Sequence, residues 1–216
     1  MTLGNFALIL IGAVLSSSLT LLCVSRLSEG AKLSLAFKLS MVFLCTLNMY
    51  LAFFFSEMPF FYALFGVYLI ITAGIDLLTK TIVVSLTVMG GMIGFLMNLL
   101  YTANLKDGLM GGLIGFCIYF AIYFISKLIY KREAFGFGDV LFITSIGLFL
   151  GFSMTILTSF LTFYVALFGI IIVKLIGKMV RLKSEIAFAP FISIATVIVL
   201  YYGRNIMQIY MTFVGL

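Results

Sequence analysis

The chain has 216 residues, of which 64% are hydrophobic and only 9% are charged, and its mean hydropathy is +1.32. Soluble domains are about half apolar and a quarter charged. This composition therefore excludes a water-soluble globular fold, and the many aromatic residues exclude a disordered chain. The formal net charge of +6 reflects the orientation of loops across a membrane more than any nucleic-acid partner.

Long apolar runs follow one another along the chain, each close to the roughly 20 residues that cross a bilayer. They predict an all-α fold, a polytopic membrane helical bundle of about eight transmembrane helices in one integral membrane domain, residues 1–216. No basic residue precedes the first run, which argues against a cleaved signal peptide. The tail 204–216 either lies along the interface or extends the last span. The expected spans are 4–24, 39–55, 60–77, 81–101, 108–129, 140–154, 156–176 and 187–203.

The basic residues indicate how these spans are oriented. With eight spans, alternate loops fall on the same side of the membrane. One side then holds Arg26, Lys32, Lys38, Lys80, Lys127, Lys131, Arg132, Lys174, Lys178, Arg181 and Lys183, and the other holds Lys106 and Arg204. Because Lys and Arg accumulate on the cytoplasmic side, the first group is expected to face the cytoplasm, with both termini outside.

Two further residue types have simple interpretations. Glycines four residues apart favour close packing of helices in lipid. Such pairs occur at Gly90 and Gly94, Gly111 and Gly115, and Gly147 and Gly151. The three cysteines are isolated in apolar runs and the chain has no histidine. A structural zinc site needs clustered ligands of these types, so we expect no metal site and no cofactor.

Two of the seven acidic residues lie at the membrane edge. Asp76 closes the third expected span, and Asp139 opens the sixth directly after Gly136-Phe137-Gly138. An ionisable group at membrane depth is costly and usually functional. Alternatively, each Asp simply ends its helix, Asp139 as an N-cap. The other acids are expected to be solvated loop charges: Glu29, Glu57, Asp107, Glu133 and Glu185.

Two carboxyl groups brought close together cannot both ionise, so one keeps its proton. Such a pair can act as acid and base on one water molecule, and this is an arrangement for hydrolysing a peptide bond without a metal. Glycines beside one Asp would let an extended substrate backbone approach without meeting a Cβ atom. The sequence therefore predicts that Asp76 and Asp139 form a catalytic pair.

Gly136-Phe137-Gly138-Asp139 resembles the GxGD motif of membrane aspartyl proteases. The stretch from Asp76 to Ile82, with Lys80 between them, resembles the D-x-x-x-[KR]-x-I stretch of type IV prepilin peptidases. The glycine-spaced helix after Asp139 fits the same family, and Phe188-Ala189-Pro190-Phe191 is similar to its late F-G-P-F segment. The resemblance covers nearly the whole chain, most clearly residues 65–195.

This resemblance implies an enzyme that cleaves leader peptides from prepilins or pseudopilins at the cytoplasmic face of a prokaryotic plasma membrane, in type IV pilus assembly or protein secretion. It implies that Asp76 and Asp139 are the catalytic residues. Gly136 and Gly138 would shape the substrate site, with lesser contributions from Lys80 and Pro190. The expected partners are the leader segments of these substrates and the lipid bilayer.

The sequence also departs from the family pattern. Val83 stands where the family often has Pro, and Ala189 where it usually has Gly. The segment after Arg26 lacks the long cytosolic loop with two CxxC pairs that accompanies N-methylation of the trimmed pilin in bacterial members. We therefore expect peptidase activity without N-methyltransferase activity.

Two other interpretations remain open. One is a GxGD protease of the presenilin or signal-peptide-peptidase type, which cuts inside transmembrane helices. Ile75 before Asp76 and Phe191 after Pro190 disfavour it, because those proteases carry Tyr-Asp and Pro-Ala-Leu. The other is an ion-coupled transporter that uses the two Asp as ion sites, although we find no internal repeat of the kind common in transporters.

Overall fold

The computed structural model describes residues 3–28, 33–102, 104–130, 135–175 and 187–214. Over these residues the chain forms eight α-helices and a short π-helix, without a strand. Seven of the α-helices are long and apolar enough to cross a membrane, and α6 is shorter. The expected all-α membrane bundle is therefore confirmed. The bounds are α1 Leu3–Leu27, α2 Leu35–Phe55, α3 Pro59–Thr79, α4 Val84–Met97, the π-helix Asn98–Thr102, α5 Leu105–Tyr130, α6 Phe137–Leu150, α7 Phe152–Leu175 and α8 Ala189–Val214.

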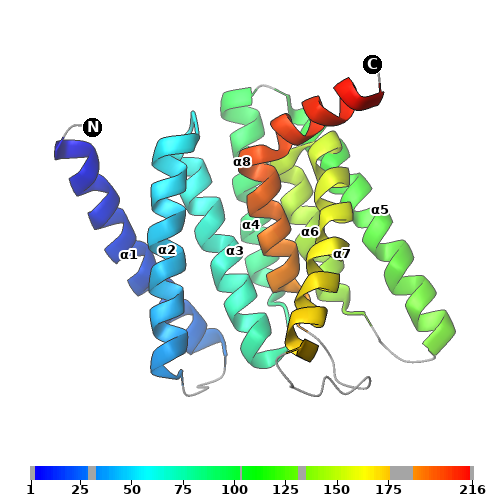
Figure 1. Ribbon diagram of the computed structural model, residues 1–216, viewed down its shortest axis with the longest axis horizontal. Coiled ribbons are helices and arrows are strands. Elements are labelled where there is room, and N and C mark those ends of the chain that lie inside the picture. Colours follow the sequence, from blue (N-terminus) through cyan, green and yellow to red (C-terminus); the bar gives the residue numbers. More distant parts are fainter. Residues whose placement is uncertain (1–2, 29–32, 103, 131–134, 176–186, 215–216) are drawn as a thin grey trace.

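Several helix boundaries differ from the expected ones, most clearly at two connections and at the C-terminal end. Gly151 alone separates α6 from α7, with a φ of 81° that favours glycine. The first connection is also shorter than expected, because α1 continues to Leu27 and α2 begins at Leu35, where Ser34 caps it by accepting the N–H of Phe37. At the other end of the chain, the tail extends the last helix, and Figure 1 shows its final turns bending away from the bundle.

The helices α3 and α6 lie at the centre of the bundle (Figure 1). α3 contacts α1, α2, α4 and α8, whereas α6 contacts α4, α5, α7 and α8. A helix that is apolar all round is expected to be buried, and α6 fits this rule, since its buried residues include Val140, Phe142, Ile143, Ile146 and Phe149. The two helices that carry Asp76 and Asp139 are thus enclosed by the others.

Glycines allow α6 to approach its neighbours closely. A Cβ atom on Gly111 of α5 would lie only 2.3 Å from the carbonyl oxygen of Gly147, and the reverse distance is the same. A Cβ atom on Gly94 of α4 would lie 2.7 Å from the backbone nitrogen of Phe149. The packing role predicted for these glycines is confirmed.

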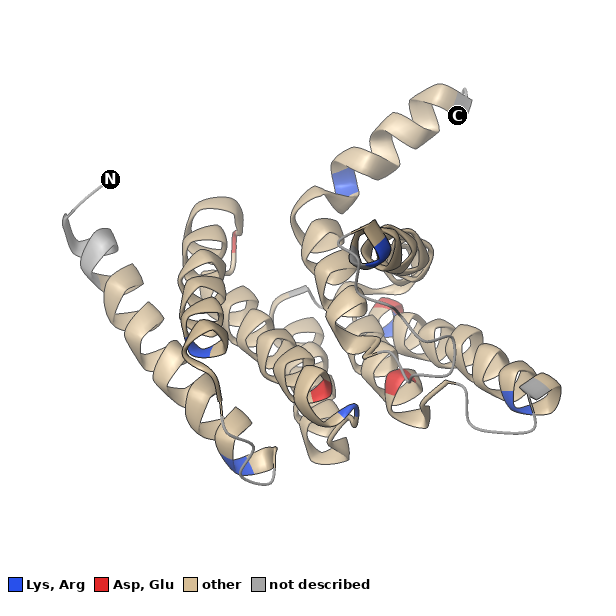
Figure 2. Ribbon diagram, turned by 60° about the horizontal axis from the view of Figure 1, so that its bottom comes forward, with Lys and Arg blue, Asp and Glu red and all other residues tan. Residues whose placement is uncertain are grey.

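Successive helices alternate in direction, so the two termini lie at one end of the bundle (Figure 1). Asp76 and Asp139 lie at the opposite end, where α3 ends and α6 begins. Figure 2 shows that the charged residues of the described chain lie near helix ends, away from the middle of the bundle. Of the larger basic group, Lys32, Lys131, Arg132, Lys178, Arg181 and Lys183 lie outside the described residues.

Candidate functional site

Asp76 lies in the last turn of α3, and only 4% of its surface is exposed. Its Oδ2 atom accepts a hydrogen bond of 2.9 Å from the backbone N–H of Ala189, the first residue of α8. The backbone of Phe188, the residue before Ala189, also lies close enough to favour negative charge on this carboxyl group. Free N–H groups and the helix dipole favour negative charge at a helix N-terminus. The start of α8 therefore stabilises the ionised form of Asp76.

The turn after α3 leads the chain from Asp76 towards α6. Lys80 ends the helix in the left-handed conformation, with φ 56° and ψ 32°, and its N–H donates to the Asp76 carbonyl over 2.8 Å. This conformation costs a residue with a side chain about 1–2 kcal/mol. The Lys80 side chain is exposed, whereas Ile82, two residues later, is half-buried.

Asp139 is the third residue of α6, and Gly136 is the N-cap of that helix. The alternative in which Asp139 is itself the N-cap is wrong, because its N–H already donates to the carbonyl of Gly136 over 3.1 Å. Only 8% of Asp139 is exposed. The backbone of Gly136 lies beside its carboxyl group and favours negative charge there, but its Oδ1 atom has no hydrogen-bond partner among the described residues.

Ile82 and Gly138 bring the two Asp-bearing segments into contact. A Cβ atom on Gly138 would lie 2.8 Å from the Cβ of Ile82, closer than real side chains approach. Ile82 therefore occupies space beside Gly138 that we expected a substrate backbone to use. The two carboxyl groups interact electrostatically. The structure thus brings Asp76 and Asp139 together from separate helices.

The late segment also reaches this site. Phe188 accepts the first backbone hydrogen bonds of α8, and Pro190 lies in the first turn, where its missing N–H costs little. Pro190 is half-buried. The residue that bonds Asp76 is Ala189, which the sequence did not mark as functional. Its position before Pro190 in the late motif was the signal that could have identified it.

Aromatic rings pack around the Asp139 side of the site. Phe135 contacts Phe188 with ring centroids 5.3 Å apart, and Phe188 contacts Phe163 at 6.0 Å. Tyr119 of α5 contacts Phe135 at 5.8 Å. These rings lower the polarity around the carboxyl pair, which strengthens electrostatic interactions within it.

The chemistry available at the site is that of two carboxyl groups with different surroundings. Asp76 has a backbone N–H donor, whereas Asp139 keeps one oxygen atom without a partner among the described residues. Such a pair can hold one ionised and one protonated carboxyl and so move protons to and from a water molecule. Within the described part of the chain, no three His, Cys, Asp or Glu residues are grouped as metal ligands.

The other acidic side chains do not join this pair. Glu57 is exposed, and Glu29, Glu133 and Glu185 lie outside the described residues. Asp107 is not the solvated loop charge that we expected, because its Oδ1 atom accepts the N–H of Phe152 over 3.1 Å and caps the start of α7.

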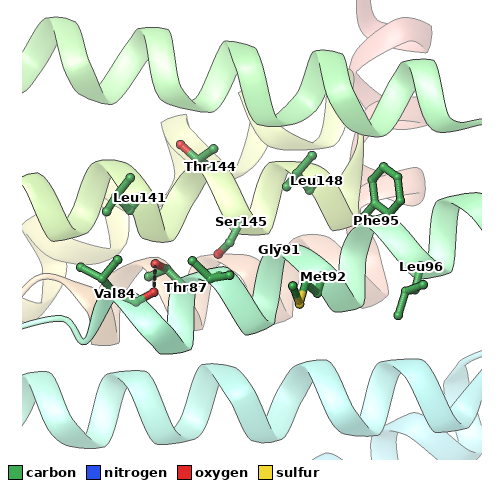
Figure 3. Close-up of a pocket in the computed structure, with 11 residues that line it drawn as sticks. Val84, Thr87, Gly91, Met92, Phe95, Leu96, Leu141, Thr144, Ser145 and Leu148 are labelled. Carbon is green, nitrogen blue, oxygen red and sulfur yellow. Dashed lines mark hydrogen bonds between the residues drawn. The ribbon is translucent and has the colours of Figure 1, made fainter.

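An apolar groove of about 610 Å³ lies between α4 and α6 (Figure 3). Val84, Gly91 and Leu96 lie along one wall, and Leu141, Ser145 and Leu148 along the other. The Ser145 hydroxyl bonds to Tyr68 and to the carbonyl of Phe142. Neither Asp lines this groove, so it is separate from the carboxyl pair.

Comparison with known protein families identifies the central part of the chain. The model of the type IV leader peptidase family matches residues 63–173, just over half of the chain. The match begins within α3 and ends within α7, so it includes Asp76 and Asp139 but not Ala189. No curated protein and no solved structure matches the chain.

Proposed function

Because the chain belongs to the type IV leader peptidase family, we propose that it is an aspartic endopeptidase that removes leader peptides from prepilin-like proteins. Cleavage takes place at the cytoplasmic face of a prokaryotic plasma membrane. The family membership supports a leader peptidase. The pairing of Asp76 with Asp139, both buried at one end of the bundle, is the observation that carries the aspartic mechanism.

The surroundings of the two carboxyl groups support different roles for them. Asp76 accepts a backbone N–H at the start of α8, which stabilises a carboxylate. It is the base that takes a proton from the attacking water. The Oδ1 atom of Asp139 has no partner among the described residues, and burying a carboxylate oxygen that accepts no hydrogen bond favours the protonated form. It is the acid that polarises the scissile carbonyl.

The reaction then has two balanced steps. As Asp76 takes the proton, the water oxygen bonds to the carbonyl carbon, and Asp139 gives its own proton to the carbonyl oxygen. In the second step the carbon–nitrogen bond breaks. Asp76 passes its proton to the leaving nitrogen, and one hydroxyl of the tetrahedral intermediate returns a proton to Asp139. Both carboxyl groups end as they began.

Four further residues are assigned to the substrate site by this proposal. Gly136 and Gly138 shape the approach to Asp139, and Gly136 is exposed. The exposed side chain of Lys80 and the half-buried ring of Pro190 lie on the segments that lead from α3 and into α8. These positions support contacts with a peptide that enters from the same end of the bundle.

The decisive experiment is co-expression with candidate prepilins, followed by mass measurement of the product. We expect the unmodified chain to remove the leader, and Asp76→Asn and Asp139→Asn each to abolish cleavage while expression and membrane insertion persist. Neither carboxyl group can replace the other in the two steps. Full processing by either variant would exclude the pair as the catalytic centre.

Asp107→Asn is the matched control, because Asp107 caps α7 at the opposite end and Asn can accept the same hydrogen bond. It should cleave normally.

The mass of the product also tests the alternatives. A cut within the hydrophobic helix of the substrate would indicate an intramembrane protease of the presenilin type. Ion uptake by proteoliposomes, with no cleaved product, would indicate a transporter.

A further inference from the structure

The mechanism above leaves one buried polar group beside Asp139 without a task, the hydroxyl of Tyr119. Tyr119 lies in α5 and is 0% exposed. Its hydroxyl has no hydrogen-bond partner among the described residues, although Thr162 of α7 lies nearby and donates its own hydroxyl to the carbonyl of Thr158. A buried polar atom without a partner is unusual, because its desolvation is not offset.

The register between α5 and α6 places Tyr119 level with Asp139. The two helices are antiparallel and in contact. Gly111 faces Gly147, and a Cβ atom on Gly115, four residues later, would lie 3.1 Å from the carbonyl oxygen of Ile143, four residues earlier. Four residues bring a helix back to nearly the same face. The next step along this seam pairs Tyr119 with Asp139.

The ring of Tyr119 is held in this position by its neighbours. Its centroid lies 5.8 Å from that of Phe135 and 6.1 Å from that of Phe163. Tyr119 and Asp139 also interact electrostatically. The site therefore contains a fixed phenol and a carboxyl oxygen, Oδ1, which both lack partners among the described residues.

We propose that Tyr119 is a positioning residue for Asp139, donating a hydrogen bond to its Oδ1 atom, directly or through one water molecule, as the reaction proceeds. This inference rests on the proposed function. When Asp139 gives its proton to the substrate carbonyl, negative charge develops on its carboxyl group. A phenol donor stabilises that charge more than it stabilises the neutral acid. The bond therefore lowers the barrier without tightening substrate binding.

The test is the variant Tyr119→Phe, which removes only the hydroxyl. With a purified prepilin as substrate, we expect kcat to fall by about ten- to a hundredfold, the range of one hydrogen bond to a charged group. KM should remain unchanged and the melting temperature in detergent should not fall, because the variant removes a buried hydroxyl without a partner among the described residues. A purely structural role would instead lower the melting temperature and would not act on kcat alone.

Two controls make the result specific. Tyr201→Phe removes another buried hydroxyl without a partner among the described residues, in α8 towards the end that carries the termini, and should leave kcat unchanged. Thr162→Val removes the hydroxyl near Tyr119 and should also retain kcat. If Tyr119→Phe cleaves at the normal rate, or if Thr162→Val reproduces its defect, the proposal for Tyr119 is wrong. If the unmodified chain cleaves no prepilin, the proposed function fails and this inference fails with it.

Discussion

At the residue scale, Gly138 determines how closely the two Asp-bearing segments approach. Its missing side chain leaves room for Ile82, which follows Asp76 along the chain. A larger residue at this position has two opposing effects. Alanine favours a helix over glycine by about 1 kcal/mol, whereas overpacking costs about 1–3 kcal/mol. We expect the overpacking cost to be the larger effect, because the new methyl group would meet the Cβ atom of Ile82, which cannot move without its backbone.

We therefore predict that Gly138→Ala separates the carboxyl pair and reduces cleavage strongly, with a modest loss of stability. The measurements are kcat/KM on a prepilin and the melting temperature in detergent. Gly91→Ala is the control, since a Cβ atom there would first meet the flexible end of Leu148, at 3.3 Å. It should leave kcat/KM unchanged and should not lower the melting temperature, since Ala favours the helix.

A second substitution tests whether Ile82 is the cause. The atom nearest the new methyl group is the Cβ of Ile82, which Ile82→Ala retains and Ile82→Gly removes. Combined with Gly138→Ala, only Ile82→Gly should restore part of the cleavage. If Gly138→Ala raises KM alone, with both double variants equally impaired, then Gly138 acts through substrate contact and not through Ile82.

At the element scale, Asp107 determines how α7 begins. Gly151 is the only residue between α6 and α7, and the Asp107 carboxylate accepts the N–H of Phe152 there. Replacement of a helix-capping Asp by Ala costs about 1 kcal/mol, whereas Asn keeps the acceptor. We predict a lower melting temperature in detergent for Asp107→Ala, a nearly unchanged one for Asp107→Asn, and normal cleavage by both. Equal destabilisation by the two variants would show that charge matters and not the cap.

These elements show what the sequence could and could not predict. The spans were predictable because apolar runs of membrane length are visible in one dimension, and Asp76 and Asp139 stood out as charges within them. Ala189 and Tyr119 could not be identified as site residues in this way. The sequence does not show which neighbours an uncharged residue in an apolar run contacts. Asp107 was misinterpreted because its partner lies far along the chain, and only the packing of α5 against α6 and α7 brings the two together.

At the scale of the whole molecule, the orientation across the membrane decides which compartment the carboxyl pair faces. Eleven of the thirteen basic residues fall on the Asp76 side in the eight-span arrangement, which favours the cytoplasm for that side. After replacement of the three native cysteines, we predict that an impermeant thiol reagent labels Lys106→Cys in intact cells but Thr81→Cys only after permeabilisation. Both positions are exposed in the structure. The opposite labelling pattern would place the pair outside the cell.

The size of the connections at the Asp76 end of the bundle bears on which reactions we expect the molecule to perform. α1 ends at Leu27 and α2 begins at Leu35, so the connection at the position of the family's cysteine-containing loop is even shorter than the sequence suggested. Residues 25–38 contain no cysteine and no histidine. Paired thiolates could fold a longer loop around zinc, but this segment has neither those ligands nor the length for an S-adenosylmethionine pocket.

We therefore predict that the chain cleaves prepilins without methylating them. The purified protein is incubated with a prepilin and S-adenosylmethionine, and the mature product is weighed. The expected mass is that of the trimmed chain with a free N-terminal amine, and omission of S-adenosylmethionine should leave both the mass and the rate unchanged. A product heavier by one methyl group, formed with no other enzyme present, would contradict the prediction. It would show that methyl transfer can take place between the helices, without the loop that accompanies it in bacterial members of the family.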